Sequence, residues 1–280
     1  MNRFRLGLRL AGASWRVVRK EKSLIAFPLL AAAFGIGYAA LVMLPLGVIG
    51  FVVFDDNSVL GWVLLALGLF GMNIGASFFG VAAAANASHV LDGKDPTLST
   101  GIGVAWSRKG VIVKWGLVSA TVGLVLQLVA DRAGGLGGTL IQMIGGAAWS
   151  IASFFVLPIL ALEGLGPFDA LKRSLSVIRA HWGESIVGGA AVGLVTGLIA
   201  LAGIGVAVLG VLTGLNATWA GGVPLIVIGL ILFFTGVTVG AVLRAVFTVV
   251  VYRYATENLV AEGFPAEDLE QVFHAKKSRR

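Results

Sequence analysis

Five long stretches of the chain contain almost no charged residue. They cover residues 24–54, 57–90, 111–130, 133–162 and 185–243. A helix needs about 20 apolar residues to cross the hydrocarbon core of a bilayer, so each stretch is long enough to do so. Helices of soluble proteins are instead amphipathic and about 10–14 residues long. The pattern therefore predicts membrane-spanning helices and argues against a soluble fold.

The last of these stretches is too long for a single crossing. As one helix it would extend for roughly 88 Å at 1.5 Å per residue. Glycine, asparagine, threonine and proline are concentrated at residues 213–224, which predicts a turn there. The chain is therefore predicted to be an all-α membrane protein with six transmembrane helices arranged as three hairpins. The spans are expected near residues 24–50, 60–86, 111–130, 139–162, 186–212 and 223–250.

Basic residues alternate between the two ends of the predicted spans. The N-terminal segment, the second–third connection, the fourth–fifth connection and the C-terminal tail are rich in lysine and arginine, whereas the three opposite connections hold only Arg132. Basic residues near span ends stay in the cytoplasm. We therefore expect a multi-pass protein of the plasma (inner) membrane with both termini cytoplasmic. Its parts would be a basic N-terminal segment (1–22), a six-span domain (23–254) and a cytoplasmic tail (255–280).

Two basic segments next to predicted spans are amphipathic. In the first, one helical face carries Phe4, Leu8, Ala11, Trp15 and Val18, and the other faces carry Arg5, Arg9, Arg16 and Arg19. In the second, one face carries Phe168, Leu171, Leu175, Ile178 and Trp182, and the others carry Lys172, Arg173 and Arg179. The pattern predicts cytoplasmic interfacial helices whose cations contact anionic lipid headgroups.

The two amphipathic segments also match each other when one is shifted by 160 residues. The matching pairs are Ser14–Ser174, Val17–Val177, Val18–Ile178 and Arg19–Arg179. Weaker copies occur at residues 98–106 and 269–273. One interpretation is three copies of a unit that joins an interfacial helix to a membrane hairpin. The alternative is independent origin, because positive-inside charge and interface anchoring each favour such segments.

Composition narrows the chemistry further. Apolar residues make up 58% and charged residues 12% of the chain, about half the charge of an average soluble domain. The absence of cysteine excludes disulfides and thiolate metal sites, and the three histidines are far apart in sequence. We expect no cofactor and no metal. The net charge of +7 is placed at predicted membrane surfaces, which favours lipid over nucleic acid.

A few polar residues fall inside predicted spans. Arg244 precedes Arg253 by nine positions, so it lies roughly 13 Å deeper along its helix. A charge at such a depth costs about 2.5–3.5 kcal/mol on insertion scales. One hypothesis is a substrate or anion site formed by Arg244, Glu163, Asn73 and Asn86. The other is that Arg244 snorkels to the surface or pairs with Glu163.

The remaining polar and small residues predict packing rather than chemistry. Asn73, Gln127 and Gln142 are expected to join helices by hydrogen bonds. Asp131 and Arg132 are expected to form a solvated loop pair. Glycines four residues apart favour close helix crossing, within the chain or between copies. These are Gly71 and Gly75; Gly189, Gly193 and Gly197; and Gly236 and Gly240.

A short motif carries a family resemblance. Residues 166–174 read Gly-Pro-Phe-Asp-Ala-Leu-Lys-Arg-Ser with Trp182 downstream, and residues 13–16 read Ala-Ser-Trp-Arg with Phe27-Pro28 following. The chain resembles uncharacterised prokaryotic six-helix integral membrane proteins classed as domains of unknown function. It is more distantly similar to the membrane domain attached to some glycerophosphoryl diester phosphodiesterases. The resemblance implies a six-span fold and no known activity.

Three functions are compatible with these features. The chain contains no phosphate loop and no evident nucleophile–base pair. The first hypothesis is thus a non-enzymatic membrane module that organises anionic lipids, a protein partner or a second copy of itself. The second is a small transporter or channel with a cytoplasmic-side cavity around Arg244. The third is a membrane enzyme acting on lipid.

Overall fold

In the computed structural model, the described residues are 12–19, 21–50, 59–180, 185–257 and 259. The regular elements of these ranges are helices, and six of them are long and apolar enough to cross a membrane. They are Ser23–Val48, Val59–Leu91, Lys109–Ala133, Gly135–Leu162, Thr196–Asn216 and Trp219–Glu257. The predicted all-α class and the six spans are confirmed. The arrangement as three hairpins with interfacial helices stays a prediction.

The chain divides into two compact units, and each is described by itself. One contains residues 26–180 and the other contains residues 1–25 and 181–280. The first unit contains most of α2 (Ser23–Tyr38), followed by a π-helical turn (Ala39–Met43) and α3 (Leu44–Val48). The π-helical turn ends two residues before Pro45, whose missing N–H interrupts α-helical hydrogen bonding.

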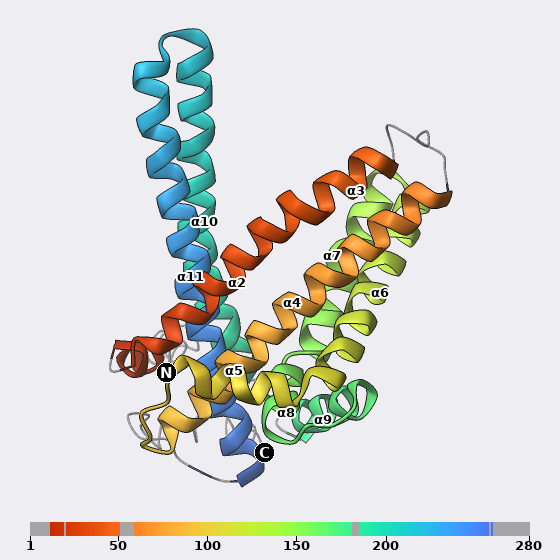
Figure 1. The fold of residues 1–280 in the computed structure, drawn as a ribbon, viewed down its shortest axis with the longest axis vertical. Coiled ribbons are helices and arrows are strands. Elements are labelled where there is room, and N and C mark those ends of the chain that lie inside the picture. The colour runs from red at the N-terminus through yellow and green to blue at the C-terminus, as the bar shows by residue number, and fades with distance from the viewer. Residues whose placement is uncertain (1–11, 20, 51–58, 181–184, 258, 260–280) are drawn as a thin grey trace, which may run out of the picture. The chain divides into compact units, whose positions relative to one another are not determined.

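The second span ends where a glycine reverses the chain. α4 (Val59–Leu91) is followed by Gly93 at φ 71°, the Lys94 N–H donates to the His89 carbonyl (3.0 Å) and the Gly93 N–H donates to the Val90 carbonyl (3.0 Å). This is a Schellman cap. α5 (Leu98–Ser107) then begins with a capping box at Thr97 and packs on α4 (Figure 1).

The fourth span is broken in the middle. α6 (Lys109–Ala133) is followed by α7 (Gly135–Ala152), and α8 (Val156–Leu162) begins after a turn at residues 153–155. At this turn the Phe155 N–H donates to the buried Ser174 Oγ of α9 (Pro167–Ala180) at 3.3 Å. Because an unpaired buried N–H is costly, this bond holds α9 against the break.

The predicted apolar face of α9 is only partly correct. Ile178 is buried, but Phe168 is 64% exposed, and Leu171 and Leu175 are half-buried; Trp182 lies outside the described residues. The buried stripe is instead Ala170, Ser174, Val177 and Ile178. The apolar face was expected to contact lipid, but α9 packs against α6, α7 and α8, and the small residues of the buried stripe allow that close contact.

Residues 12–19 form a helix with a burial pattern like that of α9. Ser14, Val17 and Val18 are buried, as are their matched partners in α9, and Arg19 is exposed like Arg179. Trp15, which was predicted to lie on the apolar face, is 39% exposed. The rest of the predicted face (Phe4, Leu8 and Ala11), together with Arg5 and Arg9, lies outside the described residues. The equal burial supports the matched pairs, and the threefold repeat stays a prediction.

In the other unit, two long helices pack along each other through small residues. α10 (Ser185–Asn216) and α11 (Trp219–Glu257) lie side by side (Figure 1). A Cβ atom added at Gly210 would lie 2.6 Å from the Ile226 backbone nitrogen, and one at Gly236 would lie 2.7 Å from the Ala200 nitrogen. Gly203, Gly222 and Gly229 are equally close to the facing backbone. Only glycine permits this approach.

The glycine pairs predicted from spacing have different outcomes. Gly71 and Gly75 pack under Tyr38 and Phe34 of α2, and Gly236 and Gly240 pack against α10, so these pairs serve contacts within the chain. Gly197 has no atom within 4 Å of an added Cβ. The side chain of Arg244 lies near Gly193, and the surroundings of Gly189 are not described.

Candidate functional site

Basic side chains face outward at one end of the first unit. On α9, Lys172, Arg173 and Arg179 are exposed, while the opposite side of the helix is buried. At the corner between α5 and α6, Lys109 Nζ lies 5.0 Å from the centroid of the Trp106 ring, which is 63% exposed. We call these residues (Lys109, Lys172, Arg173, Arg179 and Trp106) the basic face of this unit.

The end of α8 connects the two parts of this basic face. Glu163 Oε1 lies 3.5 Å from Arg173 Nε of α9. The next residue, Gly164, has φ 66°, and its Cα is covered by the Arg108 guanidinium so closely that an added Cβ would collide with it. A cation at the carboxyl end of a helix is favourable because the helix dipole is negative there. Glu163 and Gly164 therefore hold two arginines from different elements near each other.

The predicted pair between Arg244 and Glu163 stays a prediction, because the two residues belong to different units. Within its own unit, Arg244 is exposed, and a Cβ added at Gly193 of α10 would lie 3.6 Å from Arg244 Nη2. Among the described residues of that unit, no carboxylate is within ion-pairing distance of Arg244. Further along α11, Arg253 Nε lies 3.2 Å from Glu257 Oε2.

The two asparagines of the predicted polar site lie at different levels of α4. They are 13 residues apart, which corresponds to roughly 20 Å along the helix. Asn73 Nδ2 donates to the carbonyl of Leu69 in its own helix (3.0 Å), so it does not join helices by that bond. Asn86 is fully buried, and its Nδ2 donates to the Thr97 carbonyl (3.0 Å). Asn86 therefore positions α5, and the two side chains do not share a small site.

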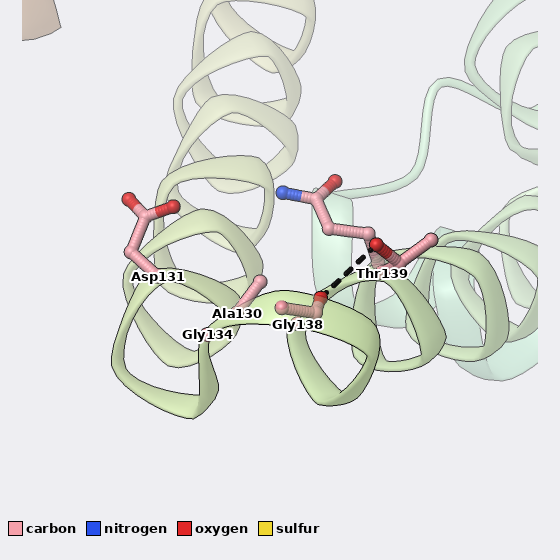
Figure 2. A pocket seen from close by; sticks show the side chains of 7 residues that line it. Ala130, Asp131, Gly134, Gly138 and Thr139 are labelled. Atoms are coloured by element: carbon pink, nitrogen blue, oxygen red, sulfur yellow. Dashed lines mark hydrogen bonds between the residues drawn. The ribbon is translucent and has the colours of Figure 1, made fainter.

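At the other end of α6, polar residues surround an open hollow. Its volume is about 570 Å³, and it lies between the end of α6 and the start of α7 (Figure 2). The lining residues are Ala130, Asp131, Gly134, Gly135, Gly138, Thr139 and Gln142. Gln142 Nε2 donates to Gln127 Oε1, which confirms the prediction that these two glutamines join helices.

The role of Asp131 differs from the prediction. Gln127 Nε2 donates to Asp131 Oδ1 (3.1 Å), so the expected loop pair with Arg132 is replaced by an amide contact within α6. Sequence reasoning missed this hollow because Gln127 and Gln142 are 15 residues apart and meet only when α7 folds back on α6. The available signal was the presence of one neutral glutamine in each of two consecutive predicted spans.

The fold and its apolar helices define the class of protein: this is an all-α integral membrane protein with six candidate spans. Within that class, a family model described as "Family of unknown function (DUF6159)" matches residues 59–262, and the chain belongs to this family. The predicted membership of an uncharacterised membrane family is thereby confirmed. No curated protein matches the chain. The comparisons do not support the distant resemblance to the phosphodiesterase membrane domain.

Proposed function

We propose that the protein is a non-enzymatic membrane module that binds anionic lipid headgroups through the basic face at α9 and the α5–α6 corner. The observation that carries this function is the orientation of α9. The small and apolar residues on one side of α9 are buried against the neighbouring helices. Lys172 and Arg179 are therefore exposed on the other side. Each cation near an anionic surface contributes about 1 kcal/mol of binding free energy.

The exposed aromatic residues near these cations support the same function. Trp106 and Phe168 are 63% and 64% exposed although they are large and apolar. The amphipathic ring of tryptophan is enriched at the headgroup level of a bilayer, and phenylalanine is typical of the face that an interfacial helix inserts there. Two of the acids in this region, Glu163 and Asp169, have basic neighbours within 4 Å, so they reduce but do not reverse its positive charge.

The proposal predicts a loss of anionic lipid in the variant Lys172→Gln/Arg179→Gln. Purified protein in mixed micelles of phosphatidylglycerol and phosphatidylcholine should enrich the anionic lipid. The variant should reduce that enrichment about 30-fold, because two cations of about 1 kcal/mol each are removed. Raising the salt concentration should produce the same loss in the native chain. The measurement is quantification of retained lipid by mass spectrometry.

Arg132→Gln is the matched control, because this exposed cation lies at the opposite end of α6. It removes one positive charge and should leave the enrichment unchanged. Equal retention of both lipids by the native chain, or full enrichment by the double variant, would contradict the proposal.

A small transporter or channel is the second candidate, and the exposure of Arg244 favours it. Anion flux into proteoliposomes should fall at least tenfold in Arg244→Ala, because removing a charge contact costs roughly 1.5–3 kcal/mol. Arg244→Lys, which keeps the charge, should retain part of the flux. Flux that is the same in Arg244→Ala and in the native chain would remove this residue from the mechanism.

A further inference from the structure

The hollow between α6 and α7 has a fixed hydrogen-bond direction. A carboxylate only accepts hydrogen bonds, so the Gln127 atom next to Asp131 Oδ1 must be its amide nitrogen. The Gln127 oxygen then faces Gln142 and must accept from Gln142 Nε2. As a result, the amide oxygen of Gln142 is not used in this chain of bonds. Asp131 thus defines the orientation of both amides.

The hydroxyl group in the hollow also has a fixed hydrogen-bond direction. Thr139 Oγ1 donates its hydrogen to the Gly135 carbonyl (3.2 Å), so it presents only lone pairs to a ligand (Figure 2). Asp131 contributes a negative charge, and among the described residues no cation pairs with it. The hollow therefore combines one carboxylate, one amide oxygen and one hydroxyl oxygen as acceptors, all within a lining otherwise made of glycine and alanine.

We propose that this hollow binds a primary ammonium group, presented by a phospholipid headgroup of the ethanolamine type. An ammonium has three donors and no acceptor, which matches the three acceptor groups. Gln142 lines the hollow, and the N–H of its amide that does not bond to Gln127 can donate to the phosphate of the same headgroup. Neither amide needs to rotate, because their orientation is already determined by Asp131.

The position of the hollow favours a lipid as the source of the ammonium. It lies at Ala130, about 32 Å along α6 from Lys109, which is close to the thickness of a hydrocarbon core. The side chains around it are apolar and exposed: Leu128, Val129, Leu136, Leu140 and Met143. A bound headgroup would therefore have acyl chains next to an apolar protein surface. This site is separate from the basic face, so the inference does not rest on the proposed function.

The test compares phosphatidylethanolamine with phosphatidylcholine of identical acyl chains. Choline carries three methyl groups on its nitrogen and cannot donate hydrogen bonds. The purified full-length chain in mixed micelles should retain the ethanolamine lipid at least about tenfold more strongly, as charge-assisted hydrogen bonds predict. Asp131→Asn, which keeps the shape and removes the charge, should abolish this preference. Retained lipid is measured by mass spectrometry.

A control variant and a competition experiment test whether Asp131 and the membrane lipid are responsible for the preference. Arg132→Gln changes the neighbouring exposed residue, which does not line the hollow, and should keep the preference. Competition by soluble phosphoethanolamine would identify the free amine as a sufficient ligand, and failure of that competition would identify the membrane lipid. Equal retention of the two phospholipids, or an unchanged preference in a folded Asp131→Asn, would overturn the proposal.

Discussion

Gly203→Val is expected to force α10 away from α11 and to destabilise the protein by about 3 kcal/mol or more. A side chain at this buried position would collide with the backbone of α11 at Gly229 and Phe233, which a rotamer change cannot relieve. Overpacking in a tight core costs about 1–3 kcal/mol, and backbone contacts are the least adaptable case. The midpoint of thermal unfolding in detergent should fall by several degrees.

Gly205→Val is the matched control for this prediction. Gly205 is two residues away in the same helix, is exposed and has nothing within 4 Å of an added Cβ. Both substitutions have the same effect on helix propensity and hydrophobicity, so the difference between their unfolding midpoints isolates the packing. Equal midpoints for the two variants would show that α10 and α11 do not approach through Gly203.

Gly101→Val is expected to detach α5 from α4 with a similar loss of stability. A Cβ at Gly101 would lie 2.6 Å from the Ala82 carbonyl oxygen and 2.7 Å from Asn86 Oδ1. The substitution would therefore also disturb the bond from Asn86 to the Thr97 carbonyl, which holds the start of α5. We expect about 3 kcal/mol of destabilisation. Unfolding in detergent measures it, and accelerated proteolysis near residues 94–108 would show the local detachment.

Gly103→Val provides the comparison in the same helix. Gly103 is exposed and meets nothing within 4 Å, so its replacement should be nearly neutral. A Gly101→Val protein as stable and as protease-resistant as Gly103→Val would show that α5 does not pack on α4 in this way. Because Trp106 belongs to α5, the same variant should also weaken anionic lipid binding if the basic face depends on this helix.

The polar residues inside the spans illustrate how far sequence reasoning extends. Their presence in apolar stretches identified Gln127 and Gln142 as residues that join helices, and the structure confirms that pair. For two other polar residues sequence reasoning suggested different contacts: Asn73 was expected to join helices, and Glu163 was considered as a partner of Arg244. Asn73 bonds to its own helix, and Glu163 pairs with Arg173. Such partners depend on how the chain folds back, which spacing along the sequence does not contain.

The sequence by itself determined the number of spans, their approximate ends and the helical class. In a bilayer every backbone polar group must bond within its own helix, so a long uncharged stretch has few alternatives. These hydrogen bonds join residues that are close in sequence, so the spans can be predicted without knowing the tertiary contacts.

Only the tertiary structure decided which residues of a local sequence pattern contact another helix. Gly203 and Gly205 occur in the same Gly-Ile-Gly sequence, yet only Gly203 faces another backbone. Ser174 is buried because the fourth span breaks at Phe155, and Asp131 lines a hollow because α7 returns beside α6. The physical reason is that lipid accepts any apolar side of a helix, so hydrophobicity does not single out the side that packs. The packing side is determined by close backbone contacts and by hydrogen bonds between polar groups of different helices.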